Sequence, residues 1–296
     1  MAERRKLGLG TVQFGLAYGV ANTGGQVGPS QVEQILACAA KAGIGVVDTA
    51  AAYGESESVL GRCLPPAFDF RIVTKTLPLR VPRVDAEDLA KVERAFESSL
   101  QRLRQPRVDA LLVHHAEDLL VPGGESLYAR LGDWRDAGLV NRIGVSIYDR
   151  RQLDQLLERY TFDLVQLPVN VFDQRLLRDG TLSLLQQRGI EVHARSVLLQ
   201  GLLMMEPGRL PAHFGELSAH CERYDRVLKT AGVSRLSAAL GFVANLPEVA
   251  VTLIGVDSVR HLEECIAAFD QGSNPDLSSF AVDQPALVDP RRWPPR

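Results

Sequence analysis

Short apolar runs rich in β-branched residues recur along most of the chain, with amphipathic stretches between them. Apolar side chains fill nearly every position of these runs, which is typical of parallel strands covered by helices on both faces. Because strand and helix alternate about eight times, the pattern favours a closed (β/α)8 TIM barrel over an open doubly wound sheet. The expected strands are KLGLGT near the start and segments 44–50, 71–76, 109–115, 142–147, 162–169, 190–197 and 249–256.

The amphipathic stretches predict helices between these strands. Segment 85–103 opens with an acidic first turn, which suits the helix dipole, and segment 125–138 ends at a glycine. Segments 176–189 and 260–270 follow the same logic. No repeat, low-complexity tract or linker divides the 296 residues, so we expect one domain over residues 1–296, with an irregular proline-rich tail from about residue 271.

The composition argues against several classes of protein. Hydrophobic residues make up 46% of the chain, which is enough for a large core. A net charge of −3 argues against nucleic acid or an anionic membrane as the main partner. No secretory signal is expected, and no stretch approaches the roughly 18 apolar residues that span a membrane. Because the four cysteines lack CxxC spacing, we expect a reduced, cytoplasmic protein, although two disulfides remain an alternative.

Four polar residues stand just after expected strands, where the active site of an α/β barrel is built. Asp48 ends IGVVD, Tyr53 follows in the next loop, Lys75 ends RIVTK and His114 ends VDALLVH. A carboxylate, a phenol, an ammonium and an imidazole that meet at one mouth make a proton-donating site. A lone loop tyrosine is usually structural, so the prediction rests on the four residues together.

Lys75 is hard to explain structurally, because an unpaired buried ammonium is costly. We expect Asp48 to be its partner. An ammonium close to a phenol favours the phenolate, so the pKa of Tyr53 is predicted to fall from about 10 toward the working range. A tyrosine tuned in this way gives a proton to a carbonyl oxygen as a hydride arrives at the carbon.

His114 and His115 are adjacent, so on a strand they point to opposite faces and only one of them faces the mouth. Zinc binding, with His193, His213 or His220 as further ligands, is the rival explanation. No His and Cys spacing of a known zinc type is present, so we expect no metal. The alternative for His115 is a hydrogen-bonded histidine at the edge of the strand.

In order and spacing, the chain resembles the aldo-keto reductases, which are (α/β)8-barrel oxidoreductases with a nicotinamide cofactor. The resemblance covers most of the length: GLGT, DTAAAYGESESVLGR, VTK, DALLVHH, GLVNRIGVSIY, VQLPVN, VHARSVLLQGLL and TLIGVDSVRHLEEC. It implies NAD(H) or NADP(H) as the cofactor. It also implies that Tyr53 is the proton donor, that Lys75 and Asp48 tune it, and that His114 orients the carbonyl. His114 is chosen because the family's histidine follows the strand's aspartate, here Asp109, by five residues.

The same resemblance implies which residues hold the cofactor. Ser146 and Gln166 match positions that hold the nicotinamide carboxamide, whereas Ile147 replaces the usual asparagine. Arg195 stands where the family commonly stacks an aromatic ring on the nicotinamide; a guanidinium plane can also stack, although its charge disfavours the oxidised form. The implied contacts are Gly10, Thr11, Asp48, Ser146, Gln166, Arg195, Ser196, Leu198, Gly201, Gly255, Asp257 and His261.

The choice between the two cofactors depends on the segment that starts at Gly255. Many family members place lysine or arginine there to grip the adenosine 2′-phosphate, and this chain has Asp257. A carboxylate repels a phosphate and accepts from ribose hydroxyls instead. Arg260 and His261 could partly compensate. We therefore expect NADH to be favoured over NADPH.

Two functions remain open. The first is reduction of an aldehyde or ketone to an alcohol. The second is a nicotinamide-binding redox sensor or regulatory subunit with little turnover, for which alone a protein partner is expected. The substitutions at Ile147, Arg195 and Asp257 motivate the sensor, and the complete set of four catalytic candidates favours the enzyme.

Long loops after the strands shape the substrate pocket in barrels of this kind. The candidates are segments 21–29, 115–124 and 204–216 together with the tail. Arg209, His213 and Glu216 suggest a polar, sugar-like carbonyl or alcohol substrate. The alternative is that these are surface loops with no substrate role.

Overall fold

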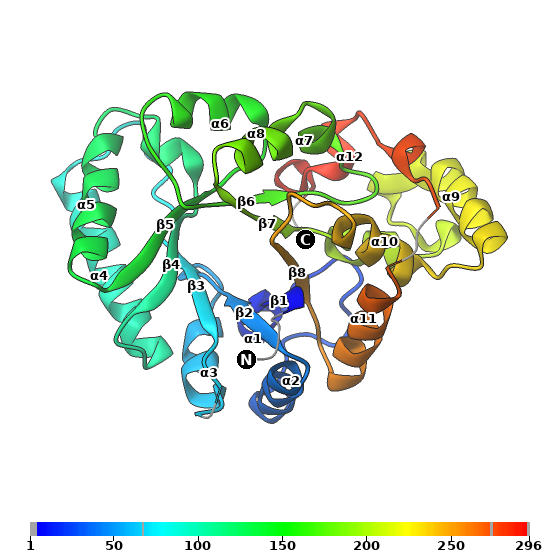
Figure 1. The fold of residues 1–296 in the computed structure, drawn as a ribbon, viewed down its shortest axis with the longest axis horizontal. Helices are drawn as coiled ribbons and strands as arrows, with labels where there is room; N and C mark the ends of the chain where they lie inside the picture. The colour runs from blue at the N-terminus through cyan, green and yellow to red at the C-terminus, as the bar shows by residue number, and fades with distance from the viewer. Residues whose placement is uncertain (1–4, 67, 273–274, 295–296) are drawn as a thin grey trace.

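The computed structural model describes residues 5–66, 68–272 and 275–294. In these residues, parallel strands close into one barrel in sequence order, β1 to β8, with β1 paired to β8 (Figure 1). The predicted (β/α)8 barrel is therefore confirmed. The strands are β1 Arg5–Gly10, β2 Ile44–Asp48, β3 Arg71–Lys75, β4 Val108–Val113, β5 Val140–Ser146, β6 Leu164–Pro168, β7 Glu191–Arg195 and β8 Val251–Gly255.

Helices surround this ring of strands (Figure 1). The predicted helix 85–103 is α4, which begins after Asp85; that side chain accepts hydrogen bonds from the backbone N–H groups of Glu87 and Asp88, both at 2.9 Å. The described helices are α1 Val12–Gly15, α2 Pro29–Lys41, α3 Ser56–Cys63, α4 Ala86–Leu103, α5 Gly124–Asp136, α6 Arg150–Leu157, α7 Arg175–Arg178, α8 Thr181–Gln187, α9 Ser218–Ala231, α10 Arg235–Ala244, α11 Val259–Gln271 and α12 Pro285–Val288.

Two parts of the helical layer differ from the sequence prediction. The expected single helix 176–189 is the pair α7 and α8, because Gly180 between them has a φ of 77°, which a right-handed helix does not contain. Between β7 and β8 the chain forms α9 and α10, and Figure 1 shows α9 lying farther from the ring than α10. Among the described residues, no single helix has the length and apolar character needed to cross a membrane.

The inside of the barrel is organised by the two-residue period of the strands. Its middle is an apolar cluster that includes Val46, Val73, Leu112, Leu164 and Leu253. Two residues later in each of these chain segments, on the same inner face, lie the residues of the mouth: Asp48, Lys75, His114, Gln166 and Gly255. The packed middle therefore separates the mouth from the opposite end of the barrel.

That opposite end carries a charged cluster, which we call the floor network: Arg71, Asp109, Arg142, Glu191 and His193. Arg142 forms ion pairs with both Asp109 and Glu191, and its Nη1 lies 2.7 Å from Glu191 Oε2. His193 Nε2 lies 2.8 Å from Glu191 Oε1, and Arg71 Nη1 lies 3.6 Å from the same oxygen. These charges neutralise one another within the network.

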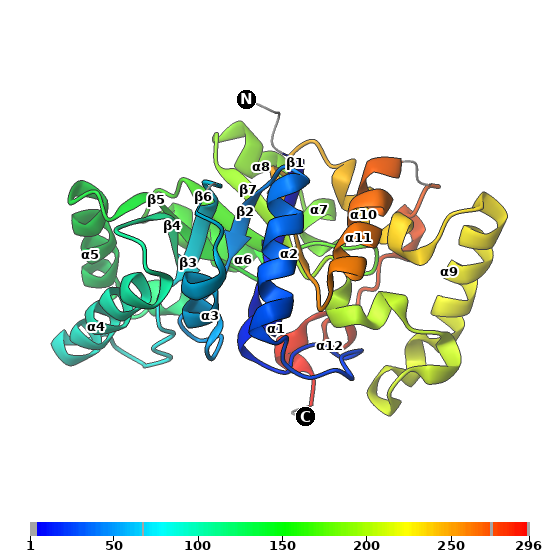
Figure 2. The same ribbon diagram turned by 90° about the horizontal axis from the view of Figure 1, so that it is seen from below.

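The segment after α11 contains only short elements: η5 Ser278–Phe280, α12 and η6 Pro290–Arg292. It is attached to the chain that follows β6, because Val282 N donates to Phe172 O at 2.8 Å and Gln174 Nε2 donates to Leu277 O at 3.0 Å. Figure 2 shows α12 at the same end of the barrel as α1, which is the end where β1 finishes. The tail therefore lies at the mouth.

The cysteines Cys38, Cys63, Cys221 and Cys265 are free, and three of them are buried. Among the described residues, no group of three or more His, Cys, Asp or Glu side chains is arranged to hold a metal ion.

Candidate active site

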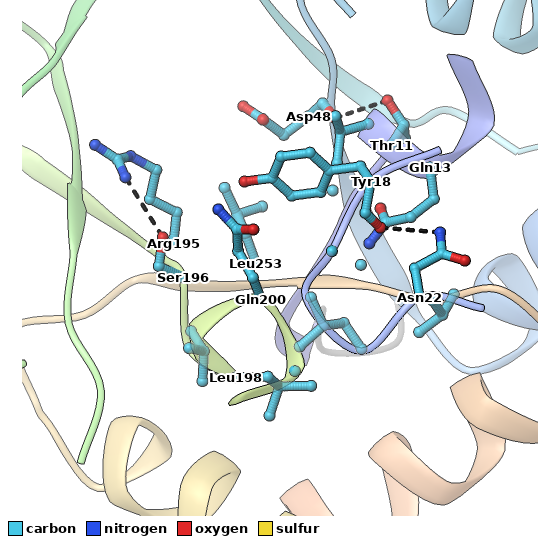
Figure 3. A pocket seen from close by; sticks show the side chains of 18 of the residues that line it. Thr11, Gln13, Tyr18, Asn22, Asp48, Arg195, Ser196, Leu198, Gln200 and Leu253 are labelled. Atoms are coloured by element: carbon cyan, nitrogen blue, oxygen red, sulfur yellow. Dashed lines mark hydrogen bonds between the residues drawn. The ribbon is translucent and has the colours of Figure 1, made fainter. Parts of the chain in front are cut away.

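A cavity of about 420 Å3 opens at the mouth, within the range of roughly 300–1,000 Å3 that ligand pockets occupy. His114 follows β4 and Gly255 ends β8; because these strands are four places apart in a ring of eight, the two residues lie on opposite sides of the mouth. We call the side with His114 the catalytic end and the side with Gly255 the far end. In Figure 3, Gln13, Tyr18 and Asn22 lie on one side of the cavity and Arg195, Ser196 and Leu198 on the other.

The ion pair at the catalytic end is formed by Asp48 and Lys75, which are 4% and 2% exposed. Lys75 Nζ donates to Asp48 Oδ1 at 2.6 Å and to the carbonyl oxygen of Thr49 at 2.8 Å. Gln166 Nε2 donates to the other carboxylate oxygen at 2.7 Å. The predicted partnership of Lys75 with Asp48 is confirmed, and both buried charges are compensated.

Tyr53 lies beside this pair in the loop between β2 and α3. Lys75 Nζ is 4.9 Å from the centroid of its ring, and the ring meets His114 edge to face with centroids 5.7 Å apart. The loop approaches Gly15 so closely that a Cβ on that residue would lie 1.9 Å from the carbonyl oxygen of Tyr53. Glycine at position 15 therefore fixes where the Tyr53 loop can lie.

The prediction that the pKa of Tyr53 is lowered is wrong for this structure. Burial and then the Asp48 carboxylate raise the pKa of Tyr53 above its usual value, and Arg195 opposes them. The reason is geometric: the Lys75 ammonium lies over the ring, and its charge is already matched by Asp48. Tyr53 is therefore a protonated phenol at neutral pH, the form that a proton donor requires.

His114 is the histidine of the pair that lines the cavity. Burial, with Lys75 and Arg195 next, lowers the pKa of His114 to about 3, so the imidazole is neutral at physiological pH. Its Nδ1 is buried without a hydrogen-bond partner among the described residues. His115 instead contacts Asp118 Oδ1 through its own Nδ1 at 3.0 Å, and this hydrogen bond raises its pKa. His114 is thus free to meet a substrate oxygen, whereas His115 is engaged.

Every residue predicted to contact the cofactor lines the cavity. Thr11 is also structural, since its Oγ1 bonds to the carbonyl oxygen of Asp48 at 2.9 Å and to Ser56 Oγ at 2.8 Å. Ser146 is 4% exposed, and the side chain of Ile147, which has no polar group, is fully buried. Gln13 Oε1 is also buried and has no hydrogen-bond partner among the described residues. An elongated ligand with amide and hydroxyl groups fits such a lining.

The loop after β7 carries a run of left-handed residues: Ser196, Leu199, Gln200 and Gly201 have φ between 48° and 88°. Non-glycine residues in this region store strain of order 1–3 kcal/mol each, which functional sites often do. The loop meets the loop after α1, because Ala21 N donates to Gln200 O at 3.4 Å and a Cβ on Gly201 would lie 2.6 Å from Ala21 Cβ. The two loops therefore cross over the cavity together.

Arg195 lines the cavity, and its guanidinium lies over Tyr148, with Cζ 4.0 Å from the ring centroid. Arg291 of the tail lies over the same ring at 3.8 Å. Two guanidinium groups cannot share one face at these distances, so they lie on opposite faces of Tyr148. One face of Arg195 is therefore covered by protein.

At the far end, Asp257 lies at the start of α11. Its Oδ1 is 3.2 Å from His261 Nδ1 and accepts from Ser258 Oγ at 3.1 Å. Arg260, which could have compensated for the carboxylate, is turned away in an ion pair with Glu264 at 2.8 Å and does not line the cavity. The ionisable side chains that line this end are thus those of Asp257 and His261.

The predicted substrate residues of segment 204–216 are not brought to the site. Of that segment only Met204 lines the cavity. Arg209 is exposed and pairs with Glu206 at 3.5 Å, and His213 Nε2 lies 3.0 Å from the carbonyl oxygen of Ala286. Arg209, His213 and Glu216 therefore give no support to a sugar-like substrate, because the segment folds into 3-10 turns against the tail.

Several lining residues were not named from the sequence: Gln13, Tyr18, Tyr148 and Gln200; Asn22 falls in the candidate loop 21–29. The position of Tyr148 at the mouth could have been predicted, because it lies two residues beyond the end of β5, where loops form the mouth. No sequence feature indicates that Gln200 and Tyr18 line the cavity, since loop sequences do not show which loops cross.

A closed barrel whose strand ends carry a buried Lys–Asp pair, a phenol and a neutral histidine belongs among the (β/α)8-barrel enzymes. Comparison with known proteins defines it further. The model of the Aldo/keto reductase family matches residues 6–277, so the chain belongs to that family. The family consists of oxidoreductases that use NAD(P)H.

Similar proteins span nearly the whole chain. Aldo-keto reductase YhdN of Bacillus subtilis is 27% identical over 88% of this chain and 84% of its own. L-galactose dehydrogenase of Arabidopsis thaliana is 27% identical over 96% and 92%. The holo form of aldo-keto reductase AKR11C1 from Bacillus halodurans superposes with a TM-score of 0.73 at 18% identity, covering 97% of this chain and 95% of that one. The last similarity concerns the fold alone.

Proposed function

We propose that this protein reduces an aldehyde or ketone to an alcohol, with Tyr53 as the proton donor. The observation that carries the proposal is the position of a protonated phenol between the compensated Lys75–Asp48 pair and the neutral His114. The carbonyl oxygen lies between the Tyr53 hydroxyl and the His114 ring. His114 orients that oxygen by donating an N–H hydrogen bond, which its neutral state allows in one tautomer.

The reaction then needs one proton and one hydride. A bound NAD(P)H would supply the hydride that the carbonyl carbon receives. The Tyr53 hydroxyl gives its proton to the carbonyl oxygen, so the product is an alcohol and the phenol becomes a phenolate. Lys75 lies near enough to stabilise that phenolate, although it does not ionise the resting phenol. Solvent returns the proton to Tyr53 through the open side of the cavity.

Gln166 and Ser146 are proposed to hold the nicotinamide carboxamide. In this structure Gln166 also donates to Asp48, so the amide links the cofactor position to the ion pair. The loop with Ser196, Leu198 and Gly201 is proposed to approach the pyrophosphate, opposite Gly10 and Thr11.

NADH is proposed as the favoured cofactor. Asp257 is the carboxylate at the far end, and Arg260 is committed to Glu264. The test is a titration with NADH and with NADPH on the wild type and on Asp257→Ser. We expect tighter NADH binding in the wild type and a smaller difference in the variant. Equal or tighter NADPH binding by the wild type contradicts the proposal.

A polyhydroxy carbonyl or alcohol is one candidate substrate, since a relative of similar length is an L-galactose dehydrogenase. We further propose that barrel and tail form one domain, because Leu287 and Val288 of the tail are buried. We also propose that the protein is cytoplasmic, because its four cysteines are free thiols.

The sensor remains the second candidate, because Ile147 presents no polar group and Arg195 replaces an aromatic ring. One experiment separates it from the enzyme: protein loaded with NADH or NADPH is mixed with a reactive aromatic aldehyde, and oxidation is followed in wild type and Tyr53→Phe. We expect rapid oxidation in the wild type and a loss of about 100- to 10,000-fold in the variant, with cofactor binding unchanged. A cofactor that binds but stays reduced in both supports the sensor.

A further inference from the structure

Arg195 has an unusual environment for a partly buried arginine. The other partly buried arginines among the described residues each lie within ion-pair distance of a carboxylate: Arg5, Arg71, Arg102, Arg130, Arg142, Arg150, Arg175 and Arg235. Arg195 has no described carboxylate at that distance. Its contacts are the Ile147 carbonyl oxygen at 3.0 Å, Ser196 Oγ at 3.5 Å and the Tyr148 ring at 4.0 Å. All three are neutral.

Most of the donors of this guanidinium also have no hydrogen-bond partner among the described residues. A guanidinium has five N–H groups, and the two contacts above occupy one group on Nη2 and, at a long distance, one on Nη1. Figure 3 shows the side chain at the edge of the cavity, with its bond to Ser196. None of these donors is among the buried unpartnered atoms of the described residues, so the free donors are accessible to a ligand in the cavity.

Arg195 is also held in place before any ligand arrives. Tyr148 covers one of its faces, and Arg291 covers the other face of Tyr148. Arg291 is in turn fixed by Asp289, which is 1% exposed and accepts from Arg291 Nη2 at 2.7 Å. A cation that is ordered in advance loses little entropy when it binds a partner.

The charges of the cavity are therefore divided between its two ends. Near Tyr53 and His114, the charge of Asp48 is neutralised by Lys75. Arg195, at the end of β7, is close enough for its charge to act to lower the pKa of both Tyr53 and His114, and its own charge is not compensated by a described carboxylate. At the far end the ionisable groups are Asp257 and His261, which face each other. A ligand that is anionic near Tyr53 and His114 matches this division.

We propose that the carbonyl substrate carries an anionic group, a carboxylate or a phosphate, and that this group pairs with Arg195 while the carbonyl lies between Tyr53 and His114. The inference rests on the proposed reduction and adds the substrate class. Charge-assisted pairs of this kind form two parallel hydrogen bonds to either anion.

Matched aldehydes test the inference. Succinic semialdehyde is compared with its methyl ester, and glyceraldehyde 3-phosphate with glyceraldehyde, in wild type, Arg195→Gln and Arg130→Gln. Arg130 is a matched control, because it is a partly buried arginine that pairs with Glu93 outside the cavity. We expect kcat/KM for the charged member of at least one pair to exceed that of the neutral member by about 10- to 100-fold in wild type and Arg130→Gln, and the ratio to fall to near one in Arg195→Gln.

The two pairs identify the source of the anion: a preference in the first pair alone indicates an oxoacid, and in the second alone a phosphate ester. Equal kcat/KM within both pairs, or a preference that survives in Arg195→Gln, overturns the inference while the proposed reduction stands. If no aldehyde is turned over, the proposed reduction fails. Calorimetry with 4-hydroxybutyrate and its methyl ester then decides the inference by itself, since it requires tighter binding of the acid by wild type than by Arg195→Gln.

Discussion

The two ends of the barrel carry charged clusters of similar composition that differ in how completely their charges are matched. In the floor network, Arg142 lies between Asp109 and Glu191, and His193 bonds to Glu191. At the mouth, Lys75 and Asp48 are matched in the same way, but no carboxylate among the described residues lies within ion-pair distance of Arg195. Strands β3, β4 and β7 contribute to both clusters, so the difference does not come from the fold alone.

The comparison shows how one barrel keeps the charges that stabilise the fold apart from the groups that act on a substrate. A buried charge that is fully paired is not available to a ligand, because separating it from its partner leaves an uncompensated buried charge. Groups left without partners are available to a substrate, at a cost in stability that the paired charges around them offset. The floor is therefore expected to govern stability alone, and the mouth to govern both stability and turnover.

The largest expected effect comes from breaking the pair at the mouth. Lys75→Met leaves Asp48 buried without its cation, which should cost about 3–5 kcal/mol of unfolding free energy. It should also lower kcat by about 100-fold or more, because the phenolate loses its stabilising charge. Denaturant unfolding and aldehyde reduction measure the two effects. Turnover that survives the substitution would place the chemistry away from this pair.

The floor should respond in stability and not in turnover. Burial opposes ionisation of Glu191, but the His193 hydrogen bond and Arg142 outweigh it and lower the pKa of Glu191 to about 2. Because the folded pKa is depressed, this stabilisation is present above the unfolded value of about 4.3 and is lost as pH falls toward 2. Glu191→Gln should cost about 3 kcal/mol at pH 7 and about 1 kcal/mol at pH 3, with kcat within twofold of wild type.

The titration of His114 should lower the stability at milder acidity, and between pH 8 and pH 5 its effect is smaller than that of Glu191→Gln at pH 7. Its folded pKa of about 3 lies below the unfolded value of 6.5, so its contribution is complete above pH 6.5 and is lost as pH falls toward 3. From pH 8 to pH 5 the loss amounts to about 2 kcal/mol. His114→Gln should remove that part of the pH dependence while leaving the acid loss from the floor. Parallel stability profiles for wild type and His114→Gln would contradict the neutral, buried histidine.

The smallest effect concerns the tail. Arg291→Gln removes the cation that covers Tyr148 but leaves Arg195 itself, so Arg195 should become less ordered. We expect the preference for a charged over a neutral aldehyde to fall by about two- to fivefold, with kcat for the neutral aldehyde unchanged. Arg292→Gln, its exposed neighbour, serves as the control. Equal ratios in both variants would show that the tail does not position Arg195.

The barrel and the Lys75–Asp48 pair could be predicted from the sequence because both follow from local rules. Continuous apolar runs identify strands buried on two faces, and a lysine at the end of such a strand requires a nearby carboxylate. The choice of His114 over His115 also followed from the strand period together with the family resemblance.

Other features depend on contacts between distant segments and could not be predicted. The direction of the Tyr53 pKa shift depends on where the Lys75 ammonium lies relative to the ring, which sequence spacing does not determine. The stacking of Arg291 on Tyr148 joins residues that are far apart in the chain. The segment 204–216 looked like a substrate loop because of its polar residues, yet it packs against the tail.

The most direct measurement compares Tyr53→Phe at the mouth with Glu191→Gln at the floor, by single-turnover oxidation of bound NADH with an aldehyde and by denaturant unfolding at pH 7. The account predicts opposite results: Tyr53→Phe loses about 100- to 10,000-fold in the hydride-transfer rate with little change in stability, and Glu191→Gln loses about 3 kcal/mol with little change in rate. A rate in Tyr53→Phe close to that of the wild type, or a comparable loss of rate in Glu191→Gln, contradicts the division between the two ends.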